Sequence, residues 1–120
     1  MNKIYDVNNI FAKILRSEVP CKKILENENA LAFSDINPQA LIHILIIPKK
    51  PYINFYDFTK NASQKELESF WKLVNETVEY YKVEEEGFRI ITNSGMNGNQ
   101  DVPHFHVHLL GGENLGRMIG

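Results

Sequence analysis

The sequence predicts a single α+β domain built on an antiparallel sheet. Two segments carry apolar residues at helical spacing, and five short segments have the β-branched or apolar character of strands. They follow one another with few long crossover connections, which favours antiparallel pairing. The 120 residues contain no repeat and no internal linker, so one domain spans 1–120. Residues 1–7 are predicted as a loose N-terminal tail and 113–120 as a C-terminal tail.

The first half of the chain is predicted to form one helix and three strands. Asn9 is a suitable N-cap for a helix whose apolar residues begin at Ile10, and Pro20 stops that helix. The third strand is apolar on both faces, which fits the centre of a sheet. The predicted strands are 22–26, 30–34 and 42–47.

The second half is predicted to form one longer helix and two strands. Ser63 and Glu66 have the spacing of a capping box, in which each satisfies a free backbone donor. An apolar stripe follows at steps of three and four, made of Leu67, Phe70, Trp71, Val74, Val78 and Tyr81. A Gly/Asn-rich loop, 94–103, separates the two predicted strands, which are 88–92 and 104–110.

Three histidines alternate with apolar residues in the last predicted strand. Successive side chains of a strand point to opposite faces, so His104, His106 and His108 are predicted to share one face. Phe105 and Val107 then take the other face and can pack in the core. The imidazoles are therefore expected on the open side of the sheet, and this grouping favours a functional role over three separate structural ones.

Zinc binding is one interpretation of this grouping. A His-x-His pair on a strand supplies two ligands, and catalytic zinc sites often use three from the protein. His104 and His108 lie about 13 Å apart along a strand, which is too far for both rings to reach one ion comfortably. A zinc site would instead combine two of the triad with His43 or Asp101.

Nucleophilic attack by the middle histidine is the favoured interpretation. A neutral imidazole is a nucleophile near neutral pH, because the ordinary pKa of histidine is about 6.5. A phosphoryl centre carries anionic oxygens, so a productive site needs donors around it, and adjacent cationic imidazoles would supply them. Clustering also disfavours charging all three rings at once, which keeps one of them nucleophilic.

Segment 104–110, HFHVHLL, matches the signature His-φ-His-φ-His-φ-φ (φ apolar) of the histidine triad family. The chain is similar to the Hint branch of that family, the purine nucleoside phosphoramidases. Further matches occur in the family's order at 10–14, 32–40, 43–50 and Gln100. The resemblance implies an α+β fold with about five antiparallel strands and two helices, a homodimer, and no metal or other cofactor.

By this resemblance, His106 attacks the α-phosphorus of an adenosine or guanosine phosphoramidate. A nucleotidyl-histidine forms, and water hydrolyses it to the nucleoside monophosphate. His108 contacts the phosphate or the leaving group and aids proton transfer. His104 and His43 lie behind His106, orient its ring and relay protons.

The resemblance also assigns substrate contacts. Asn93 and Gln100 are expected near the phosphate, and Asp35 is expected to bind the ribose hydroxyls. Asp101 replaces a serine that lies near the scissile bond in animal members. A carboxylate at this position would repel the phosphate, unless the carboxylate is protonated, turned away or bonded to the leaving amine. The base is expected against residues that spacing alone would assign to the core or a turn: Ile10, Phe11, Ile14, Phe33 and Ile36.

Composition narrows the classes of partner and compartment. The formal net charge of −2 and the absence of a basic face argue against nucleic-acid binding. No segment has the length of a membrane span or the pattern of a signal peptide, so a cytoplasmic protein without membrane contact is expected. Cys21 is the single cysteine, which excludes an internal disulfide and suits a reducing compartment. A nucleotide-binding interaction module with incidental turnover is a further interpretation that the residues leave open.

Overall fold

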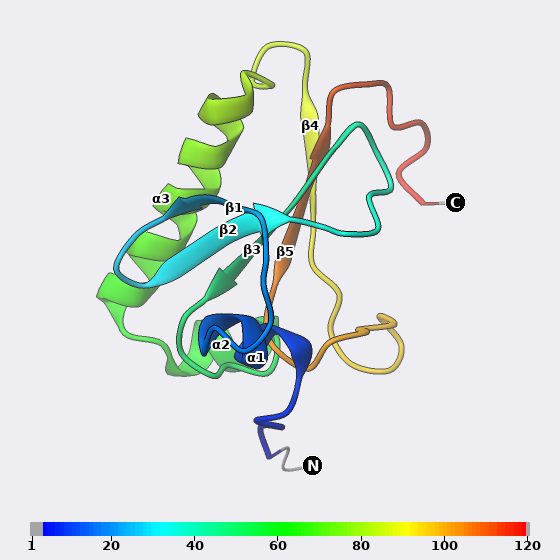
Figure 1. Cartoon of the computed structure of the whole chain (residues 1–120). Helices are drawn as coiled ribbons and strands as arrows, with labels where there is room; N and C mark the ends of the chain where they lie inside the picture. Colours follow the sequence, from blue (N-terminus) through cyan, green and yellow to red (C-terminus); the bar gives the residue numbers. More distant parts are fainter. Residues whose placement is uncertain (1–3, 120) are drawn as a thin grey trace.

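Five antiparallel strands form one sheet in the order β1-β2-β3-β5-β4 (Figure 1). The structure is a computed structural model and describes residues 4–119. The strands are β1 (Lys23–Glu26), β2 (Ala30–Ser34), β3 (Ile42–Pro48), β4 (Phe88–Ile91) and β5 (Val107–Gly111). The helices are α1 (Ile10–Leu15), α2 (Phe55–Asn61) and α3 (Gln64–Tyr81). The predicted α+β class and the five-stranded antiparallel sheet are confirmed.

The two faces of the sheet have different covers. One face packs against α3, which runs along the sheet in Figure 1. The core on this side includes residues from the sheet and from the helix: Ala32, Ile44, Ile46, Phe70, Val74, Val107 and Leu109. On the opposite face, Phe11 of α1 packs against Leu31, Phe33, Leu45 and Ile47. Because α1 is short, this second face is only partly covered, and the histidines lie there.

Helices α1 and α3 begin where the sequence predicts. The Asn9 side chain accepts a hydrogen bond from the Ala12 backbone at 2.9 Å, as an N-cap does. Ser63 and Glu66 make both hydrogen bonds of the capping box. The buried face of α3 differs from the predicted apolar stripe, because Trp71 is 38% exposed while Leu73 and Thr77 are buried.

Helix α2 was not predicted. Its seven residues are too few to show a periodic apolar stripe, and Phe58 is the residue it buries. The local signal is at its start, where the Asn54 side chain accepts from the Asp57 backbone at 2.9 Å. Residues 4–119 therefore contain three helices instead of the two that the sequence predicts.

The last strand begins three residues later than predicted, at Val107 instead of His104. The backbone before it bonds to loops instead of the ladder: Phe105 N donates to Tyr52 O at 2.7 Å, and the His106 carbonyl accepts from Thr92 Oγ1 at 2.8 Å. Phe105 still packs in the α3 side of the core with Val107. The alternation of side chains therefore survives although the ladder does not extend to His104.

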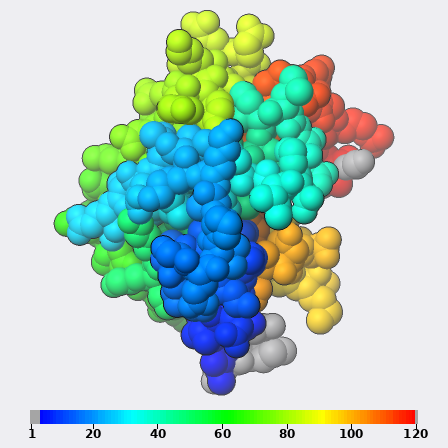
Figure 2. All heavy atoms as spheres, in the orientation of Figure 1, coloured from blue at the N-terminus to red at the C-terminus, as the bar shows by residue number. Residues whose placement is uncertain are grey.

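The N-terminal segment packs beside the loop that carries the triad. Figure 2 shows the dark-blue N-terminal part of the chain next to the orange segment that precedes β5. Tyr5, predicted to lie in a loose tail, is half-buried and contacts His104. Residues 1–3 of that predicted tail, and residue 120 of the C-terminal one, lie outside the described residues. Within residues 4–119, no helix has the length and apolar character needed to cross a membrane.

Candidate active site

The strand register brings the histidines to the face opposite α3. His108 pairs with Leu45 across β5 and β3, and His43 pairs with Leu110 two positions away on the same face. The rings of His106 and His108 lie 5.1 Å apart, and so do those of His43 and His108. His106 and His108 border a pocket of about 230 Å³, which has apolar walls. The predicted gathering of imidazoles on one face is therefore present for these three rings.

The ring of His106 is held so that one nitrogen carries the proton and the other carries a free lone pair. Its Nδ1 lies 2.7 Å from the His104 carbonyl oxygen. A carbonyl only accepts, so Nδ1 donates and the neutral ring is unprotonated at Nε2. Only 2% of His106 is exposed, yet it borders the pocket, and the Asp101 carboxylate lies 3.5 Å from Nε2. The ring is thus buried on one side and presents Nε2 toward the pocket.

His104 is buried behind the site instead of facing the open side. Its Nε2 donates to the Pro48 carbonyl at 2.9 Å, so its Nδ1 accepts from the Tyr5 hydroxyl at 2.6 Å. No part of His104 is exposed, and burial lowers its pKa to about 4. It therefore stays neutral near pH 7 and supports His106 through its backbone carbonyl.

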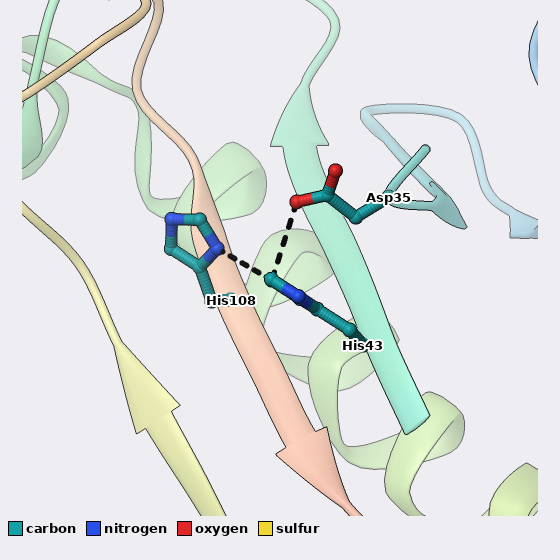
Figure 3. Close-up of side chains that lie close together, drawn as sticks. All are labelled: Asp35, His43 and His108. Atoms are coloured by element: carbon teal, nitrogen blue, oxygen red, sulfur yellow. Dashed lines mark hydrogen bonds and ion pairs between the residues drawn. The ribbon is translucent and has the colours of Figure 1, made fainter. Parts of the chain in front are cut away.

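Asp35, His43 and His108 form a connected group (Figure 3). A backbone donor outside this group fixes the positions of its protons. The Gln39 N–H donates to His43 Nδ1 at 2.9 Å, so the proton of neutral His43 is on Nε2. That nitrogen lies 2.9 Å from His108 Nδ1 and 3.3 Å from an Asp35 carboxylate oxygen. His108 Nδ1 therefore accepts, and its Nε2 carries the hydrogen.

Burial disfavours the charged form of both histidines in this group. It lowers the pKa of His43, against the opposing effect of Asp35. It also lowers the pKa of His108 to about 4, with further lowering by His106 and His43. The expectation of adjacent cationic imidazoles is therefore wrong for His104 and His108, because desolvation disfavours the charged ring. These rings act near pH 7 as neutral hydrogen-bond donors and acceptors.

His43 contacts a different triad member from the one expected. It was expected to lie behind His106 and orient that ring, but its Nε2 hydrogen bond goes to His108. The ring of His106 is oriented instead by the His104 carbonyl and by Phe11, whose ring centroid lies 4.9 Å from that of His106 in an edge-on arrangement. The register places His43 beside β5, where the side chain within reach is His108.

The five residues expected against the base all line the pocket of His106 and His108. Phe11 and Phe33 are buried, with their rings 5.6 Å apart, and form its floor. Ile10 is 41% exposed and Ile36 is 89% exposed, so these two stand at the rim. Asp35 lies at the same pocket, beside Ile36. The pocket residues are Ile10, Phe11, Ile14, Phe33, Ile36, and others that sequence reasoning missed, including Val19, Cys21, Leu45 and Val102.

Gln100 does not face the histidines. Its amide nitrogen donates to the Ile53 and Val102 carbonyls at 2.7 and 2.9 Å, and its carbonyl oxygen accepts from Gly95 N at 3.0 Å. These bonds hold the loop that precedes the triad, and Gln100 borders neither cavity that His108 borders, so its expected place near the phosphate stays a prediction. Asn93, in contrast, borders a second cavity together with His108.

The second cavity has a volume of about 720 Å³ and shares His108 with the apolar pocket. Its lining is polar and includes two arginines, Arg89 and Arg117, which the sequence did not single out. Four residues border both cavities: Asp35, Asn37, Asp101 and His108. His108 and Asp101 therefore lie at the junction of an apolar and a polar cavity, while His106 borders the apolar pocket alone.

The group of Asp35, His43 and His108 could be considered for a metal ion, since their ligand atoms lie within 4.8 Å of one another. A zinc ion would need the lone pair of His43 Nε2, which requires the proton to be on Nδ1. The Gln39 N–H points at that Nδ1 from 2.9 Å, so two donors would face each other. The proton arrangement of this group does not fit a zinc ion.

Comparison with known proteins supplies the family. The model of the HIT domain matches residues 16–115, which is most of the chain. The chain belongs to the HIT family. A HIT-like protein of Azospirillum brasilense, named as uncharacterised, is 50% identical over 99% of this chain and 98% of its own length. A maize protein named as a 14 kDa zinc-binding protein is 39% identical over 96% of this chain and 90% of its own.

Solved HIT structures have the same fold. A HIT family hydrolase of Legionella pneumophila superposes with a TM-score of 0.86 at 35% identity, over 94% of this chain and all of the other. The resemblance found in segment 104–110 is thereby confirmed at the level of the family, and the fold is that of HIT family hydrolases.

Proposed function

We propose that this HIT protein hydrolyses purine nucleoside 5'-phosphoramidates through His106. The observation that carries the proposal is the bond from His106 Nδ1 to the His104 carbonyl, because it leaves the Nε2 lone pair free at the pocket. A buried and oriented imidazole with a lone pair on Nε2 is suited to attack on phosphorus. The apolar pocket matches the size and character of a nucleobase site, with Asp35 at its edge for ribose hydroxyls.

Each step balances with the residues in place and with water. His106 Nε2 forms a bond to the α-phosphorus while the P–N bond breaks, and the leaving nitrogen takes a proton from solvent and departs as the amine, held by a hydrogen bond from His108 Nε2–H. His43 Nε2–H remains bonded to His108 Nδ1 and keeps the Nε2 hydrogen of His108 directed at the leaving group. Water then attacks the nucleotidyl-histidine, the bond to His106 breaks, and the proton that water loses returns to solvent.

Trapping the intermediate tests the mechanism. The protein is quenched in acid during turnover of adenosine 5'-phosphoramidate, and its intact mass is measured. We expect one added AMP on the wild type, none on His106→Asn, and a loss of kcat of at least about 10³-fold in that variant. His108→Ala is measured beside it, because it keeps the nucleophile and should retain the adduct while slowing its formation. Turnover by the wild type without an adduct, together with full activity of His106→Asn, would reject the mechanism.

We also infer that the chain forms a homodimer, as its resemblance to the Hint branch implies. The supporting observation is at the edge of the sheet, where β4 has one strand neighbour and Phe88 and Ile90 are 42% and 37% exposed. An edge strand with exposed apolar side chains offers unpaired backbone groups to a second copy.

A further inference from the structure

Asp101 stands at the junction of the two cavities, close to the attacking nitrogen. One of its carboxylate oxygens lies 3.5 Å from His106 Nε2, and the side chain is 77% exposed. Within residues 4–119, no lysine or arginine forms an ion pair with this carboxylate. The carboxylate also borders both the apolar pocket and the polar cavity. Among the described residues, its charge therefore lacks a cationic partner beside the place where a substrate's phosphorus must approach.

The leaving group must lie on the side of the polar cavity. The apolar pocket takes the base, and a nucleophile displaces a leaving group from the far side of phosphorus. His108, whose Nε2–H donates a hydrogen bond to that group, borders both cavities. A leaving amine close enough to accept this hydrogen bond therefore lies near Asp101, and a charge on its substituent interacts with the carboxylate.

We propose that Asp101 selects substrates by the charge of the leaving group: it favours amines that carry a second, cationic group and disfavours amines that carry an anionic group. This inference rests on the proposed phosphoramidate hydrolysis and adds its substrate class. Two unit charges about 6 Å apart change binding about 3-fold in bulk water and about 100-fold at the effective dielectric constant of a protein surface. The exposure of Asp101 places the expected factor at about 10-fold for each sign of charge.

The other charged groups of the polar cavity do not cancel this effect at the reacting atoms. Arg89 and Arg117 border the polar cavity but not the pocket of His106, and the Arg89 guanidinium donates to the Gly116 carbonyl at 2.9 Å. Asp35 lies 3.3 Å from His43 and adds to the negative charge. The two arginines would favour an anionic leaving group, so the experiment separates their influence from that of Asp101.

Three adenosine 5'-phosphoramidates that differ only in the amine test the proposal. The amines are propylamine, which is neutral at its far end, 1,3-diaminopropane, which carries an ammonium group, and β-alanine, which carries a carboxylate. The measured quantity is the ratio of kcat/KM for the diaminopropane compound to that for the β-alanine compound. Because it is a ratio within one variant, a general loss of activity cancels.

We expect a wild-type ratio well above 10, and a ratio at least about 10-fold lower in Asp101→Asn, which removes the charge and keeps the shape. Asp101→Glu should keep a high ratio. Glu85→Gln removes the same charge from an exposed residue that borders neither cavity, so it should leave the ratio unchanged.

The outcomes separate this inference from the function on which it rests. Hydrolysis of the propylamine compound with equal ratios in wild type and Asp101→Asn would reject selection by Asp101 and leave the hydrolase intact. A wild-type preference for the β-alanine compound would assign control to the arginines and reject it as well. If the wild type released no AMP from any of the three compounds, the proposed function and the inference would both be wrong.

Discussion

Three of the four histidines have one ring nitrogen assigned by a backbone group that only donates or only accepts, and His108 takes its assignment from His43. The Pro48 and His104 carbonyls accept from His104 Nε2 and His106 Nδ1, and the Gln39 N–H donates to His43 Nδ1. These backbone groups decide that His106 presents a lone pair and His108 presents a proton. The same residue type thus performs opposite roles a few ångströms apart, without any change in charge.

Burial of these rings couples folding to pH. The pKa of His104 is about 4 in the folded protein and 6.5 ordinarily, so the unfolded chain binds more protons between these values. Stability is therefore complete above pH 6.5 and falls as the pH drops toward 4. The shift corresponds to a loss on the order of 3 kcal/mol for this ring, and the lowered pKa of His108 acts in the same direction.

Urea unfolding between pH 7 and pH 5 checks this expectation in a window above the titration of most carboxylates. The wild type should lose free energy of unfolding steadily as the pH falls. His104→Gln should show a shallower slope, whatever its stability at pH 7, because the group that takes up the proton on unfolding has been removed. Parallel slopes for the two proteins would contradict the assignment.

At the scale of elements, the backbone conformation of loop 94–103 determines how the chain enters the triad. Asn99 has a φ of 57°, in the left-handed region that asparagine tolerates. At Gly98, an added Cβ would lie 2.5 Å from the Ser94 carbonyl oxygen, so a side chain does not fit without movement of the backbone. Together with the bonds of Gln100, these features set the path of the chain into His104.

The capping box is the element feature with the clearest energetic consequence. Ser63→Ala removes the acceptor for the Glu66 N–H and should lower the free energy of unfolding by about 1 kcal/mol. Ser63→Asn, which keeps a side-chain oxygen at the N-cap, should lose much less. Chemical denaturation at pH 7 measures both. Equal losses in the two variants would show that the cap hydrogen bond is not the source of the stabilisation.

The elements also show where local sequence stops being sufficient. The starts of α1 and α3 were predictable, because Asn9 and Ser63 bond to backbone groups three residues away. The start of β5 was not, because Tyr52 and Thr92 take the backbone partners of the residues before it. No periodicity in 104–110 reports on bonds made by residues so distant in the chain.

At the scale of the whole molecule, the main apolar core and the candidate site lie on opposite faces of the sheet. The face against α3 holds the main apolar core, while the opposite face carries the site under the cover of α1 and the N-terminal segment. His106, the proposed nucleophile, directly precedes β5, and the other face of the sheet packs against α3. We expect this packing to hold the His106 ring in place.

The exposed edge of the sheet predicts the behaviour of the protein in solution. Sedimentation should give twice the chain mass of 13.9 kDa, because pairing at β4 covers Phe88 and Ile90 and the unpaired backbone groups. Ile90→Lys should shift the protein toward the monomer. Ile4→Lys, a matched change at a residue that is 93% exposed and far along the chain from β4, should not. A wild-type monomer at all concentrations would contradict the dimer.

By itself, the sequence determined the α+β class, the caps of the helices, the alternation of the triad and the family, because each depends on residues close together in the chain. Tertiary structure decided which ring each histidine meets and which nitrogen is protonated. His43 meets His108 across 65 positions, and Tyr5 meets His104 across 99. Such pairs depend on strand register and on how the N-terminal segment folds back. Only these contacts bury the rings, and burial determines their charge.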